Sequence, residues 1–188
     1  NITDVMVMPQ PYGTIYANML NDRGELNVRH TYMRTGVCDV GTYTVDIALD
    51  DDGEFVDAES GSVESGVYTA QERISSMLER DYRQKVPFRL IEQTLKTGIF
   101  TASGKPIDYS HEVEEALQPL RSATLNLMSE KWQRGTTVDV IYLSGGGAEL
   151  VYEQVRDAYP QTQLVRDAQL ANARGYLNYA HFAAREMR

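Results

Sequence analysis

Residues 138–158 constrain the fold more than any other part of the chain. A largely apolar run at 138–143, interrupted by Asp139, is typical of a strand that is buried on both faces. Ser144 and three consecutive glycines follow, and the apolar spacing of residues 149–158 is that of an amphipathic helix. Another strand and helix are expected at 163–165 and 171–185. Strands that alternate with helices in this way predict an α/β fold.

The preceding part of the chain adds a meander of strands and a helical region. Its expected elements are a strand-like run at 5–8, a helix at 12–20, strands at 37–39 and 43–49, a hairpin partner at 54–58, helices at 62–84 and 87–96, a small hairpin at 97–109, and a long helix at 110–134 capped by Ser110. The whole pattern predicts a mixed sheet with helices on both faces. We expect one domain over residues 1–188, with 62–134 as an inserted helical subdomain.

Charge and composition exclude several classes of protein. The net charge of −9 and the lack of a basic cluster argue against direct binding of nucleic acid. No apolar run approaches the roughly 20 residues that a membrane span needs. The single cysteine, Cys38, excludes an internal disulfide and a cysteine metal cluster, and it fits a reducing compartment. We therefore expect a cytoplasmic protein in which Cys38 is a buried structural residue.

Residues 39–46 form the first glycine turn with candidate chemistry. A strand ends at Asp39, Gly41 permits a tight bend, and Thr42 and Thr44 flank that bend. Such a turn aims backbone N–H groups and a hydroxyl at a phosphate. The carboxylate of Asp39 suits Mg²⁺, which takes one or two protein carboxylates together with waters and phosphate oxygens. An ordinary strand–turn–strand with a glycine in the turn is the alternative.

The second candidate is the turn formed by Gly145, Gly146 and Gly147, between the buried strand and a helix. Consecutive glycines cost conformational entropy, and a close approach of backbone to a ligand is one reason to keep them. The start of the helix also offers unpaired N–H groups and a positive dipole end. The turn is neither a Walker loop nor a dinucleotide fingerprint. A simple tight turn is the alternative.

Gln10 is a third candidate because it lies between two prolines after the first apolar run. A side-chain amide can orient a water molecule for in-line attack on a phosphate. The alternative is an exposed loop residue.

Four strings in this order resemble proteins of the actin-like ATPase family. Residues 8–17 (MPQPYGTIYA) are similar to the helix after the first crossover, and residues 39–46 are similar to the second phosphate motif. Residues 141–150 (IYLSGGGAEL) are similar to the adenosine motif. Residues 167–176 (DAQLANARGY) are similar to the tail of the plasmid-segregation (ParM/StbA-like) and archaeal actin-like branch. The resemblance covers nearly the whole chain. It implies a ribonuclease-H-like domain with a five-stranded sheet, and Mg-ATP or Mg-ADP between two such domains.

The same resemblance implies roles for single residues. Gln10 matches the position that orients the attacking water, which is Glu in many plasmid-segregation actins, and Asp39 matches the aspartate that supports Mg²⁺ through water. The residues matching the loop around the β- and γ-phosphates are Gly41, Thr42 and Thr44, whereas those matching the turn at the adenosine and α-phosphate are Gly145, Gly146 and Gly147. Tyr43 is bulkier than the small residue often found in that loop.

In relatives, a helix above the base contributes contacts to the adenine or ribose. Arg89, Glu92 and Lys96 lie on the matching helix at positions i, i+3 and i+7. A solvated helix face is the alternative reading.

No first phosphate motif, an Asp-x-Gly followed by small residues, precedes Gln10. The chain therefore resembles the second, C-terminal domain, and we expect a fragment whose partner is its own first domain. Half a cleft leaves the γ-phosphate facing water, so we expect weak nucleotide binding and negligible hydrolysis by this chain alone.

The resemblance implies that the parent protein is a filament-forming ATPase. Plasmid or phage DNA segregation through an adaptor protein, or a prokaryotic cytoskeleton, is the expected use. A chaperone or sugar kinase of the same superfamily is an alternative, although a kinase needs a carboxylate base where Gln10 stands. A non-catalytic nucleotide-binding scaffold is the other alternative.

Overall fold

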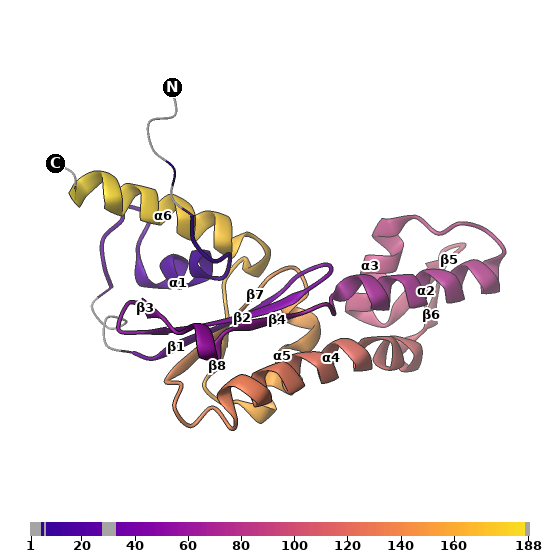
Figure 1. Cartoon of the computed structure of the whole chain (residues 1–188). Coiled ribbons are helices and arrows are strands. Elements are labelled where there is room, and N and C mark those ends of the chain that lie inside the picture. The colour runs from indigo at the N-terminus through magenta and orange to yellow at the C-terminus, as the bar shows by residue number, and fades with distance from the viewer. Residues whose placement is uncertain (1–4, 6, 28–32, 187–188) are drawn as a thin grey trace.

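A mixed β-sheet lies at the centre of the computed structural model, which describes residues 5, 7–27 and 33–186 (Figure 1). The strand order is β3-β2-β1-β7-β8, and β4 also pairs with β2. The bounds are Thr35–Val40 for β1, Val45–Asp51 for β2, Glu54–Phe55 for β3, Gly61–Val63 for β4, Val140–Ser144 for β7 and Thr162–Leu164 for β8. β2 runs antiparallel to β1, whereas β7 and β8 run parallel to it and to each other.

The sheet has five strand positions although six strands build it. β3 pairs with Asp50 and Asp51 of β2, and β4 pairs with residues 45–47 of the same strand. The two short strands therefore form one edge strand, interrupted by the 3₁₀ turn Asp57–Glu59. This arrangement agrees with the predicted five-stranded α/β fold.

Helices cover both faces of the sheet because its central strands are apolar on both sides. Val37, Val140 and Tyr142 face the helices α1 (Tyr12–Met19) and α6 (Ala171–Glu186). The residues that alternate with them, such as Cys38 and Ile141, pack in the larger core with α4 (Ser110–Trp132) and α5 (Ala148–Ala158). Cys38 is fully buried, as expected, and burial raises the pKa of its thiol.

A lobe of helices and one hairpin extends beyond the end of the sheet (Figure 1). It contains α2 (Val67–Tyr82), α3 (Phe88–Thr97), β5 (Ile99–Ala102) and β6 (Lys105–Asp108), and α4 continues from it under the sheet. Ile74, Leu78 and Leu95 are among the apolar residues that fill its interior, and they belong to the same core as the sheet.

The helices α1 and α6 cross in backbone contact. A Cβ atom on Gly175 would overlap the carbonyl oxygen of Gly13, and one on Gly13 would lie 2.5 Å from the Cα of Asn172. Glycine at both positions is therefore a packing requirement. It fixes α6 against α1 on one face of the sheet.

The structure corrects several predicted bounds. β2 begins at Val45, so Tyr43 and Thr44 belong to the loop. The helix expected from residue 62 begins at Val67, because residues 61–63 pair with β2 instead. Only Glu54 and Phe55 pair in the segment expected to be a strand at 54–58.

Two further predictions concern chain segments outside the sheet. Ser110 is the first residue of α4 and makes no capping hydrogen bond with its side chain; its N–H donates to Asp108 Oδ1 instead. Val5, Val7 and Met8 form no strand, and residue 6 of that predicted run lies outside the described residues.

None of the helices in the described part of the chain combines the length and apolar content that crossing a bilayer requires.

Candidate functional site

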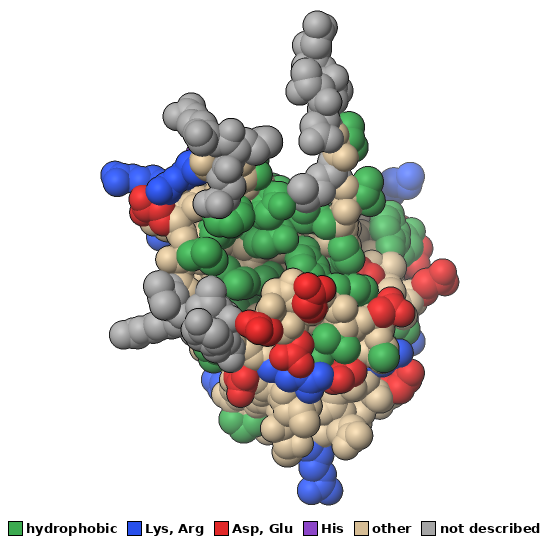
Figure 2. Space-filling model, turned by 60° about the vertical axis from the view of Figure 1, so that its left-hand side comes forward, with side chains coloured by type: hydrophobic (Ala, Val, Ile, Leu, Met, Phe, Trp, Pro, Cys, Tyr) green, Lys and Arg blue, Asp and Glu red, His purple; other side chains and the backbone are tan. Residues whose placement is uncertain are grey.

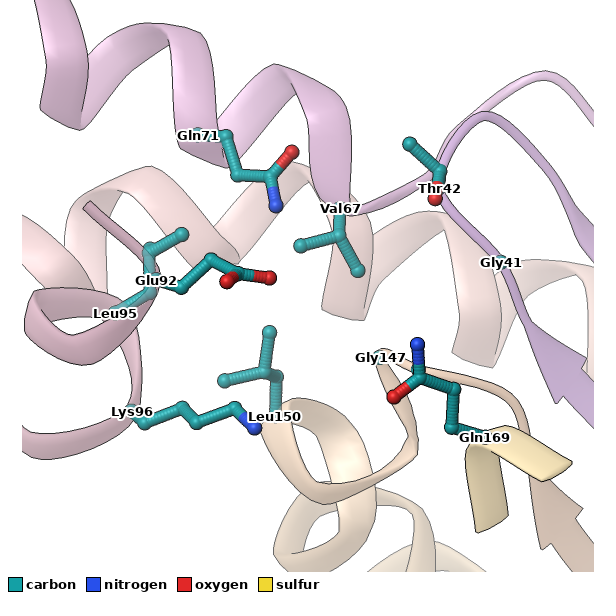
Figure 3. Close-up of a pocket in the computed structure, with 11 residues that line it drawn as sticks. Gly41, Thr42, Val67, Gln71, Glu92, Leu95, Lys96, Gly147, Leu150 and Gln169 are labelled. Atoms are coloured by element: carbon teal, nitrogen blue, oxygen red, sulfur yellow. The ribbon is translucent and has the colours of Figure 1, made fainter. Parts of the chain in front are cut away.

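A pocket lies where the two glycine turns meet the helical lobe (Figure 3). It encloses about 530 Å³ of empty space, part of which is open to solvent. Six of the predicted site residues line it: Gly41, Thr42, Glu92, Lys96, Gly146 and Gly147. β1 and β7 are parallel neighbours, and both glycine turns leave their carboxyl ends. That edge is where open α/β sheets bind ligands.

The turn after β1 is held by hydrogen bonds at its ends, whereas the N–H groups in its middle are free. The N–H of Gly41 donates to the carbonyl of Thr44 at 2.8 Å, and the carbonyls of Gly41 and Thr42 accept from the first turn of α2 at 3.2 and 2.9 Å. By contrast, the N–H groups of Thr42, Tyr43 and Thr44 donate to no other described residue. Free N–H donors in such a bend suit an anion.

Two side chains of this turn do not reach the pocket. The hydroxyl of Thr44 donates to Asp46 Oδ2 at 2.8 Å, so the predicted phosphate contact of this residue is left to its backbone. Tyr43 is 67% exposed and packs on Tyr68, with 5.2 Å between ring centroids. Its bulk therefore lies outside the bend.

The glycines of the second turn serve different purposes. Gly145 has a φ of +91°, and a Cβ atom there would overlap the Val40 carbonyl oxygen and Asp39 Oδ1. A Cβ atom on Gly147 would lie 2.5 Å from Val67 Cγ2. At Gly146 the nearest atom is 3.8 Å away, on Gln169. Gly145 and Gly147 are thus required for packing, whereas Gly146 leaves room for a ligand.

The start of α5 lies beside this open space. Leu150 N–H donates to the Gly147 carbonyl, and Gly147 N–H donates to the Val40 carbonyl at 2.9 Å. The N–H groups of Gly146 and Glu149 have no acceptor among the described residues. Free donors at a helix N-terminus favour a negatively charged group.

Helix α3 supplies a polar wall of the pocket. Glu92 and Lys96 line the pocket, and Figure 3 shows the Glu92 carboxylate and the Gln71 amide turned toward the cavity. Lys96 extends beside Leu150 in the same view. Arg89 is exposed and is not part of this lining, so the structure does not bring it together with the other two.

The two predicted catalytic residues lie next to each other. Asp39 is the penultimate residue of β1 and is only 4% exposed, and Gln10 Nε2 lies 3.5 Å from its Oδ2. A closer donor to the same oxygen, which the sequence did not reveal, is Asn172 Nδ2 at 2.6 Å. Burial raises the pKa of Asp39, and the amide of Asn172 acts in the opposite direction.

Few carboxylates lie here to hold a metal: beside Asp39 there is Asp46, its partner across β1 and β2. The described residues contain no group of three or more His, Cys, Asp or Glu side chains that could enclose an ion. Asp39 therefore fits Mg²⁺ only as one contact among waters and phosphate oxygens, which is the usual way that Mg²⁺ is bound with nucleotides. The donor set fits a hydrated ion that arrives with a phosphate.

Comparison with solved structures places the fold. The chain aligns with the archaeal actin homologue Ta0583 in complex with ADP at a TM-score of 0.76 and 24% identity, over 96% of this chain and 58% of that one. It aligns with the ParM filament from Clostridium botulinum at a TM-score of 0.73 and 22% identity, over 94% and 53%. The chain thus spans a little over half the length of these proteins. No curated protein sequence matches it significantly.

The sequence comparison with family models is more specific. Residues 37–157 match the model of the archaeal actin homologue MreB-like family, C-terminal domain. This segment covers well over half of the chain and contains both glycine turns and the helical lobe. The chain belongs to the family of MreB-like archaeal actin homologues, and the part matched is their C-terminal domain.

Proposed function

We propose that this chain is the second nucleotide-binding domain of a filament-forming, actin-like ATPase. The observation that carries the proposal is the meeting of both glycine turns and α3 at one pocket. These segments lie more than 40 residues apart in sequence, and each offers a group that suits a different part of a nucleotide. The whole of residues 1–188 is taken as this domain, with 62–134 as its inserted subdomain.

Different sides of the pocket suit different parts of ADP or ATP. Free N–H groups at Thr42–Thr44 suit the β- and γ-phosphates, and those of Gly146 and Glu149 suit the α-phosphate. Glu92 and Lys96 stand where a ribose or base would lie, against the apolar side chain of Leu150. The printed name of one aligned structure, an archaeal actin homologue with ADP, supports this choice of ligand.

Gln10 and Asp39 take the roles next to the γ-phosphate. Asp39 would support Mg²⁺ through water, and Mg²⁺ would neutralise phosphate charge when bound. Gln10 is an exposed residue whose amide lies beside Asp39, where it can hold a water molecule by hydrogen bonds. Neither residue supplies the opposite wall of a cleft. We therefore expect negligible hydrolysis without another domain.

An apolar face on α1 and α6 suits the partner domain. Figure 2 shows hydrophobic side chains gathered in the upper part of this face. Val7, Met8, Tyr176 and Tyr179 line a groove there, and Val7 is 90% exposed. Exposed apolar patches of this kind mark interaction sites. We assign this face to the contact with the protein's own first domain.

Titration calorimetry with ADP and with ATP, each with Mg²⁺, tests the nucleotide site. The chain alone should bind weakly, with a dissociation constant above the micromolar range, and should release no phosphate at steady state. Complete absence of binding would contradict the nucleotide role. Micromolar affinity together with steady turnover would contradict the proposal that hydrolysis requires a second domain.

Filament formation requires the parent protein. Light scattering of the full-length protein should increase with ATP and decay after hydrolysis. DNA segregation through an adaptor protein is the use that we favour, in the cytoplasm, since a net charge of −9 disfavours direct DNA contact. Nucleotide binding without polymers would instead favour a non-catalytic scaffold, or a chaperone or kinase of the same superfamily.

A further inference from the structure

Asp39 is held by an amide from a distant part of the chain. Asn172, in the first turn of α6, donates Nδ2 to Asp39 Oδ2 at 2.6 Å, across a separation of 133 residues. Asp39 is almost completely buried, so its charged form depends on donors within the protein. Gln10 also donates to Oδ2, but at 3.5 Å its hydrogen bond is weaker.

The orientation of the Asn172 amide is itself fixed. The hydroxyl of Thr14, a fully buried residue of α1, donates to Asn172 Oδ1 at 2.8 Å. An amide has one oxygen and one NH₂ group, so engaging the oxygen with Thr14 turns the NH₂ group toward Asp39. Thr14, Asn172 and Asp39 therefore form a directed chain of hydrogen bonds.

The backbone crossing of α1 and α6 holds this chain in place. Gly13 and Gly175 permit the contact, and Gly13 packs directly against the backbone of Asn172. Asn172 consequently cannot move relative to Thr14 without separating the two helices. The position of α6 is thus linked mechanically to the carboxylate at the end of β1.

We propose that Asn172 is a positioning residue, which fixes the Asp39 carboxylate for the hydrated Mg²⁺ of a bound nucleotide, with Thr14 setting the direction of its amide. This inference rests on the proposed nucleotide site and adds to it the residue that prepares Asp39. It also identifies α6, through Asn172, as the element whose movement would alter Mg²⁺ binding.

The test compares ADP affinity with Mg²⁺ and with EDTA, measured by calorimetry on the 188-residue chain. The ratio of the two affinities isolates the contribution of the ion. Asn172→Ala should reduce this ratio about tenfold, as the loss of an outer-shell hydrogen bond commonly does. Affinity in EDTA should change little, because Asn172 does not line the pocket.

Asn178→Ala is the matched control. Asn178 is a buried asparagine on the same helix, and its Nδ2 donates to the Leu20 carbonyl at 3.0 Å, away from Asp39. Both variants should lower the melting temperature, but Asn178→Ala should keep the Mg²⁺ ratio. An unchanged ratio in folded Asn172→Ala would overturn the assignment.

A second pair of variants covers the case in which Asn172→Ala does not fold. Thr14→Val removes the hydroxyl at nearly constant volume and should lower the Mg²⁺ ratio, whereas Thr14→Ser should retain it. Equal ratios in these two variants, or equal ADP affinity of the unchanged chain with Mg²⁺ and with EDTA, would contradict the role of Asn172 but not the nucleotide site. If the unchanged chain binds no ADP under either condition, both the nucleotide site and the role of Asn172 are wrong.

Discussion

The two glycine turns lie at the ends of neighbouring parallel strands, yet they are built in different ways. The turn after β1 is tied only at its ends and keeps the N–H groups of its middle residues free. The turn after β7 packs tightly on β1 through Gly145 and Gly147, and only Gly146 has free space around it. Glycine in such a turn can therefore be required for packing or can leave space for a ligand, and neighbouring glycines differ in which of the two applies.

The largest effect is expected at the packed position with positive φ. Gly145→Ala should lower the free energy of unfolding by about 3 kcal/mol or more, because the methyl group overlaps backbone and the φ of +91° disfavours any side chain. Urea unfolding followed by circular dichroism measures it. A loss below about 1 kcal/mol would mean that the turn can move away from β1.

Gly147→Ala should have a smaller effect on stability. The added methyl group meets the side chains of Val67 and Val40, which can shift, so we expect a loss of about 1–3 kcal/mol. The same unfolding experiment measures it. A loss equal to that of Gly145→Ala would contradict the proposal that a methyl group meeting side chains costs less stability than one meeting backbone.

Gly146→Ala should separate binding from stability. With 3.8 Å to the nearest atom, the methyl group should change the unfolding free energy by no more than about 0.5 kcal/mol. Its intrusion into the pocket should weaken ADP binding about tenfold, equivalent to about 1.4 kcal/mol. Calorimetry on the variant checks the affinity. Unchanged binding would show that the ligand does not approach this turn.

The smallest effect is expected on α3. Lys96→Ala should weaken ADP binding about threefold, because partly exposed charges contribute less than about 1 kcal/mol. Arg89→Ala on the same helix is the control and should leave the affinity unchanged, since Arg89 lies outside the pocket. Fluorescence titration with a labelled ADP compares the two. An equal loss in both variants would point to a general charge effect instead of a local contact.

Local patterns predicted much of this molecule. The apolar run before Ser144, the helix at 87–96 and the small hairpin at 97–109 were each predicted from residues close together in sequence, and the structure contains β7, α3 and β5–β6 there. The strand β4 was missed because its short sequence is compatible with the following helix. Pairing with the edge of β2, more than a dozen residues away, decides its conformation.

In the site, too, some features could be predicted from short stretches of sequence, whereas others depend on contacts between distant residues. Gly41, Thr42, Gly146 and Gly147 were predicted from turn chemistry and resemblance, and they line one pocket. Arg89 shares a helix face with Glu92 and Lys96 in sequence, but the position of α3 brings only the latter two to the cavity. The contact of Asn172 with Asp39 depends on how α6 crosses α1, which no local pattern specifies.

The most direct test of the nucleotide site is to map ADP binding by NMR on the isotopically labelled chain. With Mg-ADP, the amide signals of Thr42, Tyr43, Thr44, Gly146 and Glu149 should shift most, because their N–H groups are free to bind phosphate. The signals of Arg89 and of the outer face of α6 should stay in place. Shifts confined to other parts of the chain, or no shifts at millimolar ADP, would contradict a nucleotide site between the two glycine turns.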